Sequence, residues 1–437
     1  MKIDVTDVSP VKKTVSIEVD SETLQRETRE VLKSYARQAK IPGFRKGKAP
    51  ISVIRSRFAK EVREDVHERV MARSYRLAMK EQGLSPLGDP RVEDVEHEEG
   101  RSFRFKTTVE VLPDFEIKSY HGIEVRRPPV AATPHEVDES LEKLRESRVQ
   151  LITEEDRAAT TGDVIVADVE GTPEDGERFN REATMIELGA NDNLPAFNEH
   201  LAGVRAGARL EFSVDYPEEY GPRELAGKSV EYRLSIREVK RRQLPELDDE
   251  FAKDLGEFES IDALRAKLEE EITARKKRES EQVIRQRILD KVLLENPIVL
   301  PEVLVENEIK TRLEDGVRNL MMQGIDPEKA NIDWVELRRS QEEPARKSVH
   351  ARLALDAIAR AESVTVDAAE VDERIGRDVS RLVDQQIREN PAVMEQEKKK
   401  LRARLEKHDG LEALKSQMVR EKSLDLLTAV ANIQNEE

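Results

Sequence analysis

One short string near the N-terminus combines an aromatic side chain with several cations: Ile41-Pro42-Gly43-Phe44-Arg45-Lys46-Gly47-Lys48-Ala49-Pro50. Glycine permits tight backbone turns, so Gly43 and Gly47 predict that the side chains between them project outward together. Arg45 and Lys46 could then neutralise phosphate groups, while Phe44 enters a pocket on a partner. Composition alone favours a plainer interpretation, a solvated turn with Phe44 folded back onto its own helices.

The string lies in a basic stretch of an otherwise acidic chain. The 437 residues, enough for two to four domains, include 74 Lys and Arg against 91 Asp and Glu, a formal net charge of -17. This balance argues against general nucleic-acid binding. Between residues 33 and 63, Glu61 is the one acidic residue, and the basic residues are Lys33, Arg37, Lys40, Arg45, Lys46, Lys48, Arg55, Arg57, Lys60 and Arg63. We therefore expect one local basic patch.

A second group of residues could form an apolar cradle for a proline. Rotation about an X–Pro bond faces a barrier of roughly 18–20 kcal/mol from amide resonance, and lowering it needs no nucleophile. Apolar walls that hold the twisted imide better than the planar one would suffice. Suitable walls between residues 151 and 241 are Phe179, Leu194, Phe197, Tyr220 and Tyr232. Pattern alone favours the simpler interpretation, the core of a small domain.

Several other chemistries are excluded or disfavoured. The chain has no cysteine, which rules out disulfides, thiolate nucleophiles and Cys-ligated zinc or iron–sulfur centres and suits a reducing compartment. The histidines lack metal-ligand spacing, so we expect them at the surface; they are His67, His97, His121, His135, His200, His350 and His408. No phosphate-loop pattern occurs. We therefore expect no metal, no cofactor and no ATP-driven cycle.

The basic string is predicted to connect two helices of an α+β head at residues 1–112. Alternating side chains predict a strand over 11–19, and a helix then runs from Asp20 or Ser21 to about residue 40. Pro50 suits a first helical position, and a helical tract with one break continues to about residue 82. A second alternating segment predicts a strand over 103–111.

The middle of the chain is predicted as a linker with a helix, 113–150, and a small α+β domain, 151–241. Prolines make 113–133 an extended connector. Thr133-Pro134-His135-Glu136 is a capping box that opens a helix to about residue 149. The expected strands of the small domain are 164–169, 210–214 and 230–236.

From residue 242 to 437 the chain is predicted to be an irregular all-α body with extended arms. Its helices are separated at Ser260, Pro297, Pro301, Pro327, Asp367, Pro391 and Gly410. No heptad or longer repeat is present. Methionine and aliphatic side chains suit a surface that holds unfolded segments weakly. The candidates are Ile298, Val299, Leu300, Val303, Leu304, Leu320, Met321 and Met322, although most of them are expected to lie in the core.

The loop string resembles the signature of the trigger factor family, bacterial ribosome-associated chaperones with an FKBP-type prolyl isomerase domain. Their Gly-Phe-Arg-x-Gly-x-x-Pro motif matches Gly43, Phe44, Arg45, Gly47 and Pro50, with Lys46 between them. The resemblance implies that this loop docks on the large ribosomal subunit near the nascent-chain exit. It extends over essentially the whole chain, through the order of the domains and the segments 216–220 and 244–247.

Residues 151–241 resemble an FKBP-type prolyl isomerase at 175–179, 194–197 and 220–221. The likeness implies that Phe179, Leu194, Phe197, Tyr220 and Tyr232 line the proline pocket. The chain departs from the family pattern in four places. Val169 replaces an aromatic residue, Asn180 an acidic one and Asn193 an apolar one, and the segment at Thr184 and Met185 lacks a Phe. These departures predict weak catalysis.

The expected function is therefore an ATP-independent chaperone that shields nascent chains at the exit tunnel and accelerates X–Pro isomerisation. Its expected partners are the large ribosomal subunit and unfolded nascent polypeptides, and the resemblance leaves open a weak homodimer off the ribosome. A cell-division and cell-cycle role is attached to the family, and no residue here bears on it. An acidic start and the absence of a long apolar stretch predict a cytoplasmic protein without a membrane segment.

Two alternatives stay open. One is a soluble prolyl isomerase whose helical arms merely recruit substrates. The other is a soluble holdase with a weak or degenerate isomerase domain that does not depend on the ribosome.

Overall fold

The structure is a computed structural model of residues 1–437, and it describes 1–42, 44, 48–97, 102–154, 156–174, 177–190, 193–217, 225–256, 258–330, 332–407 and 410–436. The chain divides into two compact units. One comprises 1–127 with 282–436, and the other comprises 128–281. Both helices and sheets are present, which confirms the predicted α+β multidomain class.

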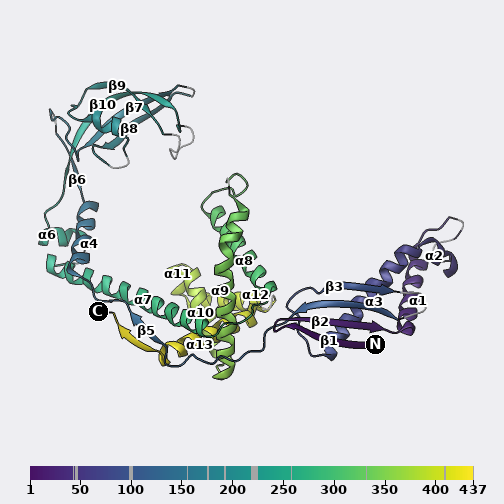
Figure 1. Cartoon of the computed structure of the whole chain (residues 1–437). Coiled ribbons are helices and arrows are strands. Elements are labelled where there is room, and N and C mark those ends of the chain that lie inside the picture. Colours follow the sequence, from purple (N-terminus) through teal and green to yellow (C-terminus); the bar gives the residue numbers. More distant parts are fainter. Residues whose placement is uncertain are drawn as a thin grey trace. The chain divides into compact units, whose positions relative to one another are not determined.

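The head is a four-stranded antiparallel sheet covered on one face by three helices (Figure 1). The strands, in sheet order, are β1 (Lys2–Ser9), β2 (Lys12–Val19), β4 (Phe103–Glu110) and β3 (Arg91–His97). The helices are α1 (Ser21–Gln38), α2 (Ile51–Arg57) and α3 (Ala59–Glu81). The inward side chains of β2 and β4 pack on these helices. They include Val15 and Ile17 of β2 and Phe103 and Phe105 of β4. The two edge strands, β1 and β3, were not predicted; β1 alternates only in its first half, and β3 is exposed along almost its whole length.

Local chemistry sets the helix ends of the head as expected. The Asp20 side chain accepts a hydrogen bond from Thr23 N at 2.8 Å, which caps α1 and lowers the pKa of Asp20 to about 2. Phe58 interrupts the helical tract between α2 and α3, and its ring lies 5.7 Å from that of Tyr35.

The helical part of the first unit follows the predicted separators closely. It contains α8 (Glu302–Met322), α9 (Trp334–Ala361), α10 (Ala368–Leu382), α11 (Gln385–Arg388), α12 (Pro391–Glu406) and α13 (Gly410–Val430), with the C-terminal end of α7 (Ile261–Glu295). Separate apolar clusters hold these helices together. Pro344 lies inside α9 without ending it.

The body is not purely helical, and part of the expected connector belongs to it. Strand β5 (Glu124–Arg127) pairs in parallel with β11 (Asn432–Asn435). The buried Asn296 side chain accepts a hydrogen bond from Lys118 N at 2.9 Å and donates one to Ser119 O at 3.2 Å. The prolines correctly indicate an extended chain, but a partner strand three hundred residues away leaves no local pattern.

The second unit begins with the predicted capping box. Thr133 Oγ1 accepts from Glu136 N at 3.3 Å, and the Glu136 carboxylate accepts from Thr133 N at 2.8 Å, opening α4 (Pro134–Ser147). These bonds and Lys276 lower the pKa of Glu136 to about 2. Helix α4 packs with α6 (Asp249–Leu255) and the start of α7 around Leu141, Phe251 and Leu264.

A twisted antiparallel sheet with one short helix forms the rest of this unit (Figure 1). Its strands are β6 (Gln150–Thr153), β10 (Ser229–Gln243), β7 (Val164–Pro173), β8 (Phe179–Glu187) and β9 (Arg209–Asp215), which pairs with β10. Helix α5 (Pro195–Leu201) packs on the sheet through Phe197 and Leu201. The predicted strands correspond to β7, β9 and β10, whereas β6 and β8 were missed.

Candidate functional site

A bulge in β8 points residues from both halves of this strand into one cavity. Along the β7–β8 pair, Val169 faces Arg181 and Ala167 faces Thr184, so β8 contains one extra residue between these positions. Ala183 in the bulge has a φ of +49°, in the left-handed region. A regular strand would place Arg181 and Thr184 on opposite faces.

An anchored carboxylate holds this bulge. Asp168 Oδ1 accepts a hydrogen bond from Ala183 N at 2.9 Å, and Asp168 Oδ2 accepts one from Arg237 Nε at 2.8 Å. The bond from Ala183 N and the Arg237 guanidinium keep the pKa of Asp168 below its ordinary value. Asp168 therefore stays ionised and able to hold the bulge.

The cavity has a volume of about 210 Å³ and is mainly apolar and aromatic. Its lining residues are Val169, Phe179, Arg181, Thr184, Ile186, Asn193, Leu194, Phe197, Tyr216 and Tyr232. The structure thus brings together four of the five predicted pocket residues, Phe179, Leu194, Phe197 and Tyr232. Tyr220 lies outside the described residues.

Aromatic rings meet edge to face around this cavity. The Phe197 ring lies 4.9 Å from Tyr232 and 5.2 Å from Phe212, and the Phe179 ring lies 6.1 Å from Tyr232. The Phe179 ring covers Gly171 of β7, where any side chain would overlap it. The hydroxyl groups of Tyr216 and Tyr232, both buried, are 2.5 Å apart. These contacts hold the walls in place.

Three of the departures from the family pattern face this cavity: Val169, Thr184 and Asn193. Asn193 is fixed there, because its Nδ2 donates to Glu187 O at 2.6 Å and to Asn198 Oδ1 at 3.0 Å. Asn180 and Met185 are exposed and do not line it. Sequence reasoning missed Arg181, Ile186 and Tyr216 as lining residues; the bulge that turns the first two inward has no sequence signature.

The described part of the basic loop presents an exposed aromatic side chain. Phe44 is 43% exposed, whereas the neighbouring Ile41 is buried, so Phe44 is not folded into the head core. Pro50 precedes α2 as its N-cap residue. Gly43, Arg45, Lys46 and Gly47 lie outside the described residues.

Cations flank this loop on the chain. Lys48, Arg55 and Arg57 are exposed, and no ion pair joins them to a carboxylate within the described ranges. The positive charge around α2 therefore remains available to an anionic partner.

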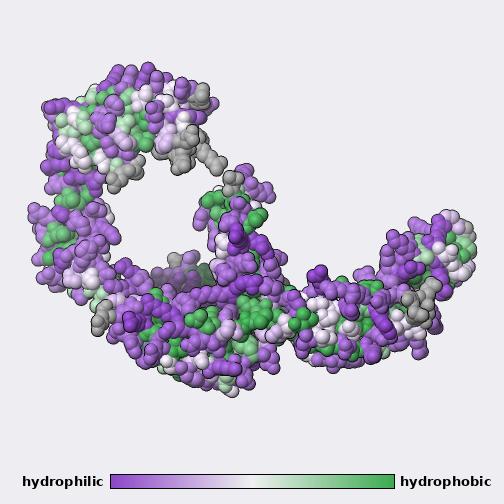
Figure 2. Space-filling view, viewed as in Figure 1, coloured by the Kyte–Doolittle hydropathy of each residue, from purple (hydrophilic) through white to green (hydrophobic). Residues whose placement is uncertain are grey.

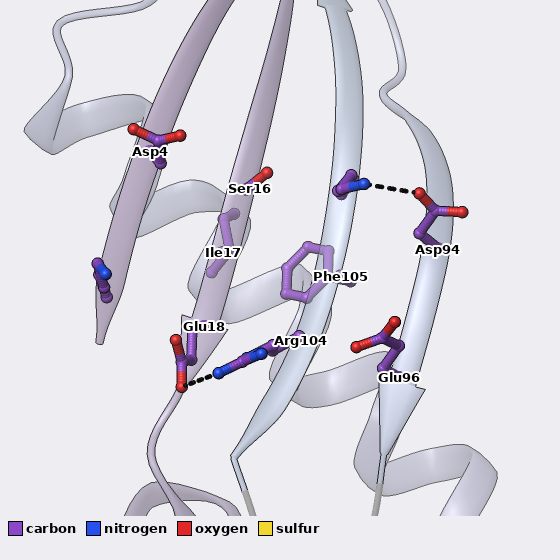
Figure 3. Close-up of a pocket in the computed structure, with 10 residues that line it drawn as sticks. Asp4, Ser16, Ile17, Glu18, Asp94, Glu96, Arg104 and Phe105 are labelled. Atoms are coloured by element: carbon purple, nitrogen blue, oxygen red, sulfur yellow. Dashed lines mark hydrogen bonds and ion pairs between the residues drawn. The ribbon is translucent and has the colours of Figure 1, made fainter.

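A different hollow, of about 370 Å³, lies on the open face of the head sheet (Figure 3). Here two of the three lining cations are paired: Lys106 Nζ lies 2.9 Å from Asp94, and Arg104 lies 3.1 Å from Glu18. Asp4 and Glu96 add two further carboxylates to the lining. This hollow is unsuited to phosphate groups.

An exposed apolar tip marks the turn between α8 and α9. Met321, Met322 and Val335 are 62%, 73% and 80% exposed, and Ile325 and Trp334 are also exposed. Figure 2 shows hydrophobic surface at this tip. By contrast, Ile298, Leu300 and Leu304 are partly buried and pack against the body core, whereas Val299 is exposed.

His67, His97 and His350 are partly buried and depart from the expected surface positions, and His408 lies outside the described residues. His67 Nε2 and His97 Nδ1 lie 2.7 Å apart, and the His67 ring packs 4.9 Å from Phe103. Burial, with smaller effects of His97 and Arg63, lowers the pKa of His67. Helix α3 covers the inner face of the sheet, which brings His67 of α3 next to His97 of β3. Among the described residues, no group of three or more His, Asp or Glu could hold a metal ion.

No helix in the described ranges has the length and apolarity needed to cross a bilayer. Family models match three segments of the chain. Residues 1–144 match the bacterial trigger factor protein, residues 260–429 match the trigger factor C-terminus, and residues 155–236 match the FKBP-type peptidyl-prolyl cis-trans isomerase.

Whole-length relatives agree with these matches. The trigger factor of Koribacter versatilis is 35% identical over 425 residues, which cover 96% of this chain and 94% of that protein. The trigger factor of Geotalea daltonii is 31% identical over 437 residues, covering 99% and 98%. A solved structure from work on substrate recognition by the trigger factor chaperone has the same fold, with a TM-score of 0.60, 20% identity, and coverage of 98% and 99%. The chain therefore belongs to the trigger factor family of chaperones and carries an FKBP-type peptidyl-prolyl isomerase domain.

Proposed function

We propose that this chain is an ATP-independent, ribosome-associated chaperone of the cytoplasm. It docks beside the nascent-chain exit of the large ribosomal subunit, shields emerging apolar segments and isomerises X–Pro bonds within them. The observation that carries the docking proposal is the exposed Phe44, flanked by cations on an acidic chain.

Electrostatics restricts which surface can meet ribosomal RNA. A net charge of -17 repels phosphate groups over most of the protein. The loop residues Gly43 to Gly47, continued by Pro50 and α2, are the basic exception. Arg45 and Lys46 would pair with phosphate groups while Phe44 enters a pocket on the ribosome.

The tip of α8 and α9 suits a weak, adaptable contact with nascent chains. Met321 and Met322 can follow irregular apolar partners, because the unbranched thioether side chain is flexible. Shallow contacts without a deep pocket allow release without ATP. The isomerase would act through the cavity, with Phe179, Leu194, Phe197, Tyr220 and Tyr232 as walls that favour the twisted imide.

The functional division that we propose has four parts. Residues 1–112 dock on the ribosome, 113–150 link the parts, 151–241 isomerise proline bonds, and 242–437 hold clients. Under this division, mutations in the loop should affect ribosome docking alone, and mutations in the cavity should affect proline isomerisation alone.

Ribosome co-sedimentation tests the docking proposal. Wild type should pellet with large subunits at moderate salt, and a Phe44/Arg45/Lys46 triple-Ala variant should stay in the supernatant. The matched control, Arg104→Ala with Lys106→Ala, removes two cations from the open sheet face and should bind as wild type does. If wild type fails to pellet, or if the triple variant pellets equally, the docking proposal is wrong.

A second candidate function is a holdase that does not depend on the ribosome and isomerises proline bonds slowly. The observation that favours it is the position of Val169, Thr184 and Asn193 in the cavity wall. It requires suppression of aggregation without ribosomes and a proline-peptide rate close to the uncatalysed one. Measured together with co-sedimentation, these two assays separate the two candidates.

A further inference from the structure

The described lining of the cavity contains one charged side chain. Arg181 is the only charged residue among its ten described lining residues. Its guanidinium carbon lies 6.0 Å from the centroid of the Phe179 ring, within reach of a cation–π contact. Because Arg181 is exposed, its charge lies at the solvent edge of the cavity.

The described carboxylates near Arg181 do not neutralise its charge. The neighbouring carboxylates already pair with other arginines, Asp168 and Glu182 with Arg237 and Glu170 with Arg178. Across the described ranges, no carboxylate forms an ion pair with Arg181. The guanidinium is charged at any physiological pH, so it offers a standing site for an anion.

The size of the cavity determines what can reach this charge. A volume of about 210 Å³ lies below the roughly 300–1,000 Å³ of ordinary small-molecule sites, so it admits one ring and little more. When that ring is a proline, the residues on either side of it must remain at the edge of the cavity. An acidic side chain there would meet Arg181.

We infer that Arg181 makes the isomerase prefer proline bonds with an acidic side chain directly before or after the proline. The inference rests on the proline pocket proposed above. An exposed ion pair of this kind should raise kcat/KM about 2- to 5-fold over a neutral residue of the same shape. The overall charge of -17 opposes any preference for acidic peptides, so the preference must originate locally.

The test uses the full-length chain and acetylated proline peptides with Glu, Gln or Lys placed before the proline, and in a second series after it. Exchange NMR gives kcat/KM without a coupled protease, and shifts in the same titrations give peptide affinities if turnover is slow. The variants are Arg181→Gln, Arg181→Lys and Arg181→Glu. Arg209→Gln is the matched control, because Arg209 is exposed on β9, outside the lining, and forms no ion pair within the described ranges.

In wild type and Arg209→Gln, kcat/KM for the Glu peptide should exceed kcat/KM for the Gln peptide in at least one of the two series. Arg181→Gln should bring the Glu-to-Gln ratio of kcat/KM to about one, and Arg181→Lys should retain part of the preference for Glu. Arg181→Glu should favour the Lys peptide. High salt should reduce the wild-type ratio. An equal Glu-to-Gln ratio in wild type and Arg181→Gln, in both rate and affinity, overturns the inference.

A cavity variant separates this inference from the pocket proposal. Phe197→Ala should lower kcat/KM and affinity for every peptide. If Phe197→Ala has no effect, the proline pocket itself is wrongly placed and the inference fails with it. If Phe197→Ala lowers both values but the Arg181 variants keep the wild-type ratios, the preference alone is wrong.

Discussion

The carboxylate of Asp168 on β7 accepts a hydrogen bond from the backbone N–H of Ala183 on β8, over 2.9 Å. This bond holds the bulge in which Ala183 takes its left-handed conformation. Because of the bulge, both halves of β8 line the same cavity: Phe179 and Arg181 before the bulge, and Thr184 and Ile186 after it.

Loss of this bond should disturb catalysis more than loss of a nearby charge. We expect Asp168→Ala to lower kcat/KM severalfold, since Thr184 and Ile186 would lose their inward orientation. Glu182→Gln is the control, because Glu182 also pairs with Arg237 but makes no bond to the bulge backbone. The measurement is exchange NMR on a neutral proline peptide, and equal rates for the two variants would contradict the prediction.

The buried tyrosine pair should contribute to stability. Tyr232→Phe removes one of two hydroxyl groups that lie 2.5 Å apart and leaves that of Tyr216 buried. The loss of one buried hydrogen bond costs about 0.5–1.5 kcal/mol. The double variant Tyr216→Phe with Tyr232→Phe should lose less free energy of unfolding than the two single variants lose in sum. The transition of the isomerase domain in urea measures each loss, and strict additivity would argue against coupling.

The two components of loop docking should respond differently to salt. Lys46→Ala should reduce the slope of log affinity against log salt by about 0.7–0.9, one phosphate contact. Phe44→Ala should weaken ribosome binding at every salt concentration without changing the slope. Fluorescence titration of ribosomes from 50 to 300 mM salt, roughly the range over which such slopes are measured, distinguishes the two. An unchanged slope for Lys46→Ala would show that Lys46 meets no phosphate.

The partly buried His67 should make the head less stable in mild acid. The pKa of His67 in the folded chain lies below the model-compound value of 6.5. The unfolded chain therefore binds more protons between these two values, so the free energy of unfolding falls as the pH drops below about 6.5. NMR titration of the histidine ring protons, assigned with His67→Gln, should give a midpoint below 6.5. A midpoint at or above that value would contradict the prediction.

The segment that precedes β5 should be released when Asn296 is removed. Asn296→Ala leaves Lys118 N and Ser119 O without the bonds that Asn296 supplies. Each of these partly buried hydrogen bonds contributes about 0.5–1.5 kcal/mol. Trypsin should then cut after Lys118 faster than in wild type. Asn319→Ala, at an exposed position of α8, should leave the cleavage rate unchanged, and equal rates in both variants would refute the role of Asn296.

Much of the helical structure was predictable because helix ends are decided by a few neighbouring residues. Asp20, Thr133 and Asp367 each accept a hydrogen bond from a backbone N–H three residues ahead, and Pro391 occupies the favoured first position of α12. The loop string and four of the cavity residues were likewise accessible, through residue types and spacing that resemble a family.

The tertiary structure decided the features that join distant residues. The sequence contains Asp168 and Ala183, but only the pairing of β7 with β8 shows that they form a bulge and that Arg181 lines a cavity. His67 and His97 meet because α3 covers the sheet, and β5 finds β11 across three hundred residues. Helix capping involves residues within one turn of each other, so it can be predicted from neighbouring positions in the sequence. A site depends on strand register and side-chain packing, and these exist only once distant strands have paired.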